Sequence, residues 1–121
     1  MWERSHRSGL WAEQRALRLL EAAGWQLLDR RWSCRFGELD LMLHKPQRLL
    51  LVEVKGRRRC GCDGWGMASL DRRKRQRLRA TYGLWLAAHP HFADCCVEPV
   101  LAVVPLPPAT APVRWIRWEP V

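Results

Sequence analysis

The sequence predicts a single α/β domain, in which one helix precedes three strands and a second helix precedes two more. Three observations predict it: an amphipathic helical pattern near the N-terminus, two apolar runs separated by a short loop, and a second helical pattern beyond residue 69. The 121 residues suffice for one domain of ordinary size, and 48% of them are hydrophobic. We expect residues 1–121 to form this domain, with a core at about 8–104 and a Pro-rich loop and extra strand at about 105–121.

A first helix is expected from about Ser8 to Ala23. Its packing face has the spacing i, i+3, i+4 and i+7, at Glu13, Ala16, Leu17 and Leu20. Gly24 is the expected C-terminal cap. A short strand is expected over residues 25–32, and Gly37 interrupts the chain before the next strand.

Residues 38–55 have the pattern of a β-hairpin. Two runs, 38–44 and 49–55, flank the loop 45–48, so that facing residues have numbers that sum to 93. Asp40 then faces Glu53. One face is wholly apolar and consists of Leu39, Leu41, Leu43, Leu50, Val52 and Val54. A slip of one residue would mix polar and apolar side chains on that face, so its burial fixes the register.

A second helix is expected from about Ser69, as N-cap, to about Ala88, with a basic first half. The packing face of its second half is Leu78, Tyr82, Trp85 and Leu86. Strands are expected at 100–104 and 113–118, joined by a Pro-rich loop. Of the eight tryptophans, three are expected in the core, at Trp11, Trp25 and Trp85, whereas Trp65 could stack on an unpaired base.

The chain is basic, because 21 Lys and Arg against 12 Asp and Glu give a formal net charge of +9. This charge indicates a polyanionic partner, either nucleic acid or an anionic membrane. No apolar run approaches the ~18 residues of a membrane span, and no signal peptide is recognisable, so we expect a cytoplasmic protein. The five cysteines are expected to stay thiols. The alternative, which their spacing disfavours, is a zinc site formed by Cys60, Cys62, Cys95 and Cys96.

Asp40 and Glu53 form the candidate chemical site. Two carboxylates that face each other across a hairpin repel, unless a shared proton or a divalent cation compensates. Mg²⁺ is typically held by one or two carboxylates with water and substrate oxygens, and the Val54 carbonyl is a candidate third ligand. Lys55 follows on the same face, where its ammonium could assist the reaction or neutralise a phosphate. The alternative is an exposed strand face with solvated charge pairs.

Glu13 could extend this site. A carboxylate on the apolar stripe of a helix is costly to bury unless it is paired or bound to a metal. If the first helix packs on the sheet, Glu13 could reach Asp40 and Glu53. The alternative is that Glu13, near the first turn, favours the helix dipole.

Three segments give a resemblance to a known family: Gly9-x-x-Ala12-Glu13-x-x-Ala16, Gly37-Glu38-Leu39-Asp40-Leu41 and Val52-Glu53-Val54-Lys55. With them the chain resembles the small bacterial UPF0102 (YraN-like) family over about residues 8–104. That family is similar to archaeal Holliday-junction resolvases and to the wider PD-(D/E)XK nucleases. The resemblance implies a restriction-endonuclease-like core, with a mixed β-sheet flanked by helices.

The resemblance also implies roles for individual residues. Asp40 and Glu53 would hold Mg²⁺ (or Mn²⁺), Lys55 would be the catalytic lysine, and Glu13 would lie close to the metal. Glu38 belongs to the family pattern, and pairing with Lys55 is one role open to it. The sequence departs from the family where Pro99 replaces an expected aspartate.

Basic residues follow the acidic site in the sequence. Arginines contact phosphates without regard to base sequence, which suits a nucleic-acid partner. The candidate nucleic-acid-binding residues are Arg57, Arg58, Arg59, Arg72, Arg73, Lys74, Arg75, Gln76, Arg77 and Arg79, of which Gln76 stands where related nucleases often have a polar residue. The alternative for the helical part is a solvated face, although six cations within eight residues repel one another.

The leading functional hypothesis is a metal-dependent endonuclease that hydrolyses phosphodiester bonds in DNA, including branched or structured DNA. The alternative is a non-catalytic nucleic-acid-binding module of a DNA repair or recombination complex that keeps the nuclease fold. An RNA or anionic-membrane partner is a weaker third hypothesis. Junction resolvases act as symmetric dimers, so the resemblance also leaves a homodimer open.

Overall fold

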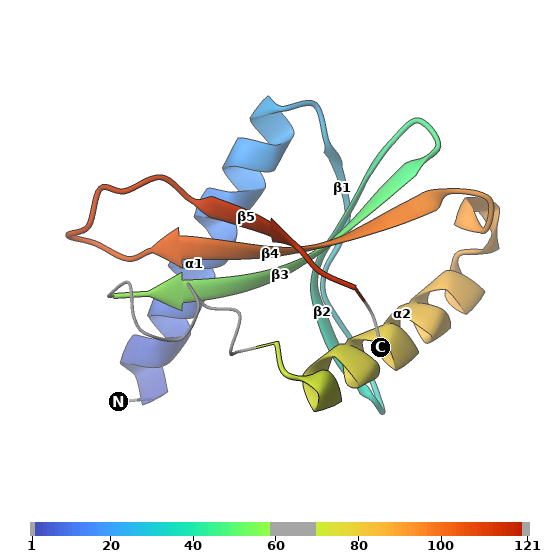
Figure 1. Ribbon diagram of the computed structural model, residues 1–121, viewed down its shortest axis with the longest axis horizontal. Coiled ribbons are helices and arrows are strands. Elements are labelled where there is room, and N and C mark those ends of the chain that lie inside the picture. Colours follow the sequence, from blue (N-terminus) through green and yellow to red (C-terminus); the bar gives the residue numbers. More distant parts are fainter. Residues whose placement is uncertain (1, 59–69, 120–121) are drawn as a thin grey trace.

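The computed structural model describes residues 2–58 and 70–119, which form a five-stranded sheet with a helix packed on each face (Figure 1). The elements are α1 (Trp2–Ala22), β1 (Gln26–Cys34), β2 (Gly37–Lys45), β3 (Arg48–Arg57), α2 (Arg72–Ala88), η2 (Pro90–Phe92), β4 (Cys96–Pro105) and β5 (Arg114–Arg117). Their order confirms the predicted α/β arrangement. Within the described residues, none of the helices combines the length and apolar character needed to cross a bilayer.

The sheet is mixed. Its strand order is β1-β2-β3-β4-β5, in which β3 and β4 are parallel and every other neighbouring pair is antiparallel. A parallel pair needs a crossover connection, and α2 lies in the segment that joins β3 to β4. The predicted strands at 100–104 and 113–118 correspond to β4, which is longer, and β5, which is shorter.

α1 packs on one face of the sheet and passes behind β3, β4 and β5 in Figure 1. The predicted face is buried, with Ala16, Leu17 and Leu20 in a cluster that includes Leu41 and Val52 of the sheet. Gly24 follows the helix with φ +96°, a left-handed conformation that suits the predicted glycine cap.

The prediction that Trp11 belongs to the core is wrong, because its side chain is 41% exposed. Its neighbour Ala12 occupies the buried stripe, and successive residues are rotated by about 100° around a helix. The same prediction is confirmed for Trp25 and Trp85, both of which are buried.

The predicted hairpin register is confirmed over most of its length. β2 and β3 pair from Leu41↔Val52 to His44↔Leu49. Pairing continues one step further, to Lys45↔Arg48, so the loop is shorter than the predicted four residues. Gln47 in this turn has φ +62°.

The pairing ends at Leu41, earlier than predicted. Asp40 there accepts a hydrogen bond on Oδ2 from the Val54 amide at 2.8 Å, and β2 turns away from β3 (Figure 1). Leu39 was expected on the same face as Leu41, yet it packs in the opposite cluster with Met42. The strict alternation of β2 is therefore interrupted beside Asp40.

The second sheet face is covered by α2, which overturns the alternative of an exposed strand face. Met42, Leu49 and Leu51 are buried there against Leu78 and Trp85, part of the predicted packing face of α2. Glu53, which contacts Lys74 of α2 on this side, is consequently removed from bulk water by a packed helix.

α2 begins at Arg72 with Asp71 as its N-cap, whose Oδ1 accepts a hydrogen bond from the Lys74 amide at 2.8 Å. The cap was predicted at Ser69, which lies outside the described residues. The spacing Asp71-x-x-Lys74 is that of an N-cap bonded to the third helical residue.

Candidate functional site

Asp40 and Glu53 lie side by side where β2 leaves β3. Glu53 is 7% exposed and Asp40 is half-buried, and their carboxyl groups are within hydrogen-bonding reach of each other. Both line a cavity of about 340 Å³ together with Glu38, Lys74 and Arg77. The structure therefore brings together the two carboxylates that the hairpin register placed opposite each other.

The environment of the pair favours the protonated state. Burial raises the pKa of Asp40 to about 8, and the nearby charge of Glu53 adds to this effect, whereas the hydrogen bond from Val54 opposes it. Burial also raises the pKa of Glu53, which the ammonium of Lys74 and a hydrogen bond with Asp40 lower in part. The same burial that raises both pKa values keeps two like charges close together, and this favours a neutral form of one carboxyl group.

One carboxylate oxygen of the pair lacks a partner in the structure. Glu53 Oε2 is buried without a hydrogen-bond partner, which is costly for a carboxylate. A proton on Asp40 or a bound divalent cation would satisfy it. The described residues contain no group of three or more His, Cys, Asp or Glu side chains placed to hold a metal. Binding of Mg²⁺ or Mn²⁺ by the pair stays a prediction.

Lys74 supplies the nearest positive charge. Its Nζ lies 3.0 Å from Glu53 Oε1, and the capped first turn of α2 holds it over the sheet. Lys74 is one of the predicted phosphate contacts of the basic helix, and the structure shows that it also pairs with Glu53. Its contact with phosphate stays a prediction.

Lys55 lines a neighbouring cavity of about 650 Å³, with Arg57 and Arg58 from the end of β3 and Ser8 from α1. Arg58 donates a hydrogen bond to Ser8 Oγ at 3.4 Å. This basic cavity adjoins the carboxylate site, because Val54 lines it and also lines a third cavity shared with Asp40. The catalytic assignment of Lys55 stays a prediction.

Glu13 is buried on α1, at 5% exposed, and reaches the site as expected. It lines the third cavity with Asp40, and its charge contributes to raising the pKa of Asp40. Its Oε1 accepts hydrogen bonds from Arg30 at 2.9 Å and from Arg31 at 2.6 Å. Two guanidinium groups thus compensate its burial, and its role as a metal ligand stays a prediction.

Glu38 is exposed and accepts a hydrogen bond on Oε2 from Ser33 Oγ at 3.0 Å. An ion pair between Glu38 and Lys55 is not among the contacts of the described residues, and the role of Glu38 at the site stays a prediction. Pro99 is buried in β4, and its carbonyl accepts a hydrogen bond from the Trp118 amide.

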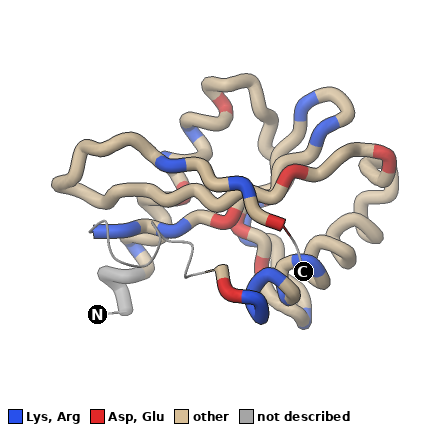
Figure 2. The backbone as a smooth tube through the Cα atoms, in the orientation of Figure 1, with Lys and Arg blue, Asp and Glu red and all other residues tan. Residues whose placement is uncertain are grey.

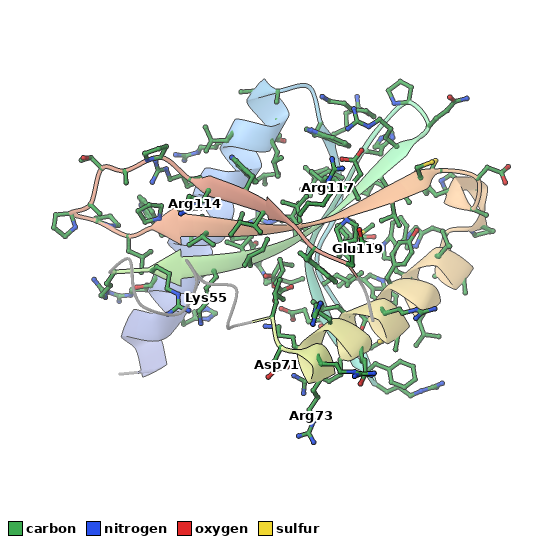
Figure 3. All side chains as sticks on the ribbon, viewed as in Figure 1. Lys55, Asp71, Arg73, Arg114, Arg117 and Glu119 are labelled. Atoms are coloured by element: carbon green, nitrogen blue, oxygen red, sulfur yellow. The ribbon has the colours of Figure 1, made fainter. Side chains whose placement is uncertain are left out.

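Basic residues flank the acidic pair on two sides. Figure 2 shows basic segments at the start of α2 and at the end of β3, with acidic segments of β2 and β3 between them. The exposed candidates for contact with phosphate are Arg58, Arg72, Arg73, Gln76, Arg77 and Arg79, and Arg73 points away from the body of the protein (Figure 3). Arg75 is half-buried and donates a hydrogen bond to the Glu119 carbonyl, and Arg57 is also half-buried.

Some predicted residues lie outside the described part of the chain, namely Arg59, Cys60, Cys62 and Trp65. Cys34, Cys95 and Cys96 are free thiols, as expected.

Three features of the site were missed in the sequence. The Arg30 and Arg31 contacts with Glu13 have no periodic signal, and Arg31 adopts an unusual left-handed φ of +48°. The position of Lys74 could have been anticipated from an N-cap at Asp71. Phe36 lies on the rim of the carboxylate cavity, and its place before Gly37 was the available signal.

The fold and the site define an α/β protein whose mixed sheet holds a buried carboxylate pair beneath a basic helix. The chain matches the uncharacterised protein family UPF0102 over residues 12–103. It is 56% identical over 113 residues to a UPF0102 protein of Prochlorococcus marinus (strain MIT 9303), covering 93% of this chain and 90% of the relative. It is 37% identical over 112 residues to a UPF0102 protein of Pseudomonas putida (strain GB-1), covering 92% and 90% respectively. The chain belongs to the UPF0102 family, as the sequence motifs predicted.

Proposed function

We propose that the protein is a metal-dependent endonuclease that hydrolyses phosphodiester bonds in DNA. The observation that carries the proposal is the buried pair of Asp40 and Glu53, with an oxygen of Glu53 left without a partner. Ordinary structural carboxylates are compensated, whereas this pair retains both a raised pKa and an unsatisfied acceptor. Such perturbed groups in a cavity are typical of functional sites.

The proposal includes a restriction-endonuclease-like core. Supporting it are the mixed sheet, the aspartate at the point where β2 leaves β3, and the segment Glu53-Val54-Lys55 on β3. α1 and α2 flank the sheet, as in the arrangement that the family resemblance implies.

Asp40 and Glu53 would hold Mg²⁺ or Mn²⁺, with the Val54 carbonyl as a further candidate ligand. A divalent ion bound there would activate water and neutralise charge on the phosphate. The Val54 amide holds Asp40 in place through its hydrogen bond. Lys55, in the adjoining basic cavity, would bind a phosphate oxygen of the DNA strand.

One observation favours the alternative of a non-catalytic nucleic-acid-binding module. Lys74 already supplies a positive charge to Glu53, so the pair is partly neutralised without a metal. In that case the buried carboxylates would fix the start of α2, and the basic helix would bind phosphates without Mg²⁺.

The deciding experiment compares the wild type with Asp40→Asn and Glu53→Gln on labelled duplex, single-stranded, flap and four-way-junction DNA. Each substrate is incubated with Mg²⁺, Mn²⁺ or EDTA. We expect metal-dependent cleavage that both substitutions abolish, with DNA binding largely retained. Matched controls are Asp94→Asn and Glu21→Gln, which remove the same charges from exposed positions.

Cleavage that persists in Asp40→Asn and Glu53→Gln at the wild-type rate would contradict the assignment of the site. Binding to DNA without cleavage of any substrate would support the non-catalytic module. Binding of Mn²⁺, followed by electron paramagnetic resonance, gives a second readout that does not depend on turnover and should be lost in both variants.

A further inference from the structure

The cavity that holds the carboxylate pair has an aromatic ring on its rim. Phe36 lines the same cavity as Asp40 and Glu53, and its side chain is 39% exposed. An exposed phenylalanine is not explained by packing of the core. Its location beside a candidate phosphodiester site suggests contact with the ligand.

The backbone around Phe36 is held in the turn between β1 and β2, next to α2. The Phe36 amide donates a hydrogen bond to Cys34 Sγ at 3.4 Å across the turn between β1 and β2. Gly37 follows with φ +150°, and a Cβ there would lie 3.5 Å from Thr81 Oγ1 of α2. The turn therefore packs closely against α2, whose first turn holds Lys74 on Glu53.

One cation lies against the ring. The Arg35 guanidinium lies over the Phe36 ring, 4.8 Å from its centroid, and Arg77 of α2 lines the same cavity. This combination of an aromatic ring and guanidinium groups matches the chemistry of an unpaired nucleotide, whose base stacks on such groups and whose phosphates pair with cations. A base inside a continuous duplex has both faces occupied by its neighbours and cannot stack in this way.

We propose that Phe36 is a stacking platform for an unpaired base next to the phosphodiester bond held at Asp40 and Glu53. The substrate class is then DNA with unpaired nucleotides, as in single strands, flaps and opened junctions. This inference rests on the proposed nuclease function and adds the feature that selects the substrate.

The test measures the binding of oligonucleotides that contain a fluorescent adenine analogue, in EDTA, so that no cleavage occurs. We expect wild-type protein to quench the fluorophore in single-stranded and flap DNA. Phe36→Ala should weaken binding of these substrates about tenfold and abolish the quenching, because base–aromatic stacking contributes substantially per base. Affinity for blunt duplex should change less than about twofold.

Two further variants separate stacking from local disruption. Phe36→Trp keeps an aromatic face and should retain both affinity and quenching. Trp115→Ala removes an equally exposed aromatic from β5 and should leave both unchanged.

The outcomes distinguish this inference from the proposed function. Equal weakening of single-stranded and duplex binding by Phe36→Ala, or no weakening, would overturn the stacking platform while metal-dependent cleavage could still be observed. Selective weakening in a protein that cleaves no DNA would support the platform and contradict the nuclease. Wild-type protein that binds no DNA would overturn both.

Discussion

A carboxylate as buried as Glu53 needs a compensating charge, and Lys74 supplies one. The ammonium of Lys74 lies 3.0 Å from one oxygen, whereas the other oxygen is buried without a hydrogen-bond partner. A proton or a divalent cation could compensate that second oxygen. At the scale of single residues, two predictions test which positive charges compensate the pair.

The first prediction concerns pH. The pKa of Asp40 is about 8 in the folded protein and 3.8 for an unperturbed side chain, so between these values the folded state binds more protons than the unfolded state. The free energy of unfolding in EDTA should consequently fall as pH rises from about 4 to 8. Asp40→Asn, which can still accept the Val54 hydrogen bond, should show a flatter profile and be more stable than wild type at pH 8.

Urea denaturation across this pH range provides the measurement, with Asp94→Asn as the matched control on an exposed aspartate. Parallel profiles for wild type and Asp40→Asn would contradict the raised pKa.

The second prediction concerns Lys74→Met, which removes the ammonium from the carboxylate pair. The free energy of unfolding without metal should fall by about 1–2 kcal/mol, because Glu53 stays buried with one partner fewer. Saturating Mg²⁺ should raise the melting temperature more in Lys74→Met than in wild type, since the metal then no longer competes with an ammonium. Calorimetric melting with and without Mg²⁺ measures both effects.

Lys55→Met is the control for this pair, because Lys55 is exposed and lines the neighbouring cavity. Its melting temperature should be close to that of the wild type. Equal Mg²⁺-induced shifts in Lys74→Met and wild type would indicate that Lys74 and the metal do not compete.

At the scale of elements, the first turn of α2 contains exposed arginines and also Lys74, which contacts Glu53 of the carboxylate pair. It contains no acidic residue, and its first three residues are Arg72, Arg73 and Lys74. Cations near a helix N-terminus interact unfavourably with the helix dipole, so this turn depends on its cap and on anionic partners. Asp71 provides the cap, and Glu53 and DNA phosphates would provide the anions.

The third prediction follows from this turn. Asp71→Ala should lower the free energy of unfolding by about 1 kcal/mol, because the amide of Lys74 loses its acceptor. Asp71→Ser keeps a capping oxygen without the charge and should retain most of the stability. Chemical denaturation of the three proteins measures the difference, and equal losses in both variants would indicate that charge rather than capping matters.

At the scale of the whole molecule, the chain has a net charge of +9, and basic segments at the start of α2 and at the end of β3 flank the acidic pair (Figure 2). Arginines of α2 and of the end of β3 lie on two sides of Asp40 and Glu53. A polyanion that contacts both basic regions would pass over the carboxylates, where a divalent ion would screen the repulsion.

The fourth prediction concerns salt. Binding of DNA should weaken steeply as salt increases, and Arg73→Gln should weaken binding of all sequences similarly and reduce the log–log slope by about 1. Arg73 is suitable because it points into solvent, so its loss leaves the packing intact (Figure 3). Arg117→Gln on β5, where Arg117 pairs with Glu98, is the control and should leave the slope unchanged.

Local patterns were sufficient to predict most of the elements. The helical spacing of Ala16, Leu17 and Leu20 identified the buried face of α1, and the apolar pattern fixed the β2–β3 register, because both signals lie within short segments. The alternation of β2 failed at Leu39, where the strand leaves its neighbour and side-chain hydrogen bonding replaces the ladder.

The sequence by itself determined the order of elements, the family, and the register of β2 and β3 from Leu41↔Val52 to His44↔Leu49, because periodicity, motifs and hairpin register are local properties. Three features became known only from the tertiary structure. Lys74 forms an ion pair with Glu53, and Arg30 and Arg31 neutralise Glu13. Phe36 borders the cavity that contains Asp40 and Glu53. These contacts depend on how α1, α2 and the β1–β2 turn pack on the sheet. Packing joins residues that are distant along the chain, and no periodic pattern encodes such pairs.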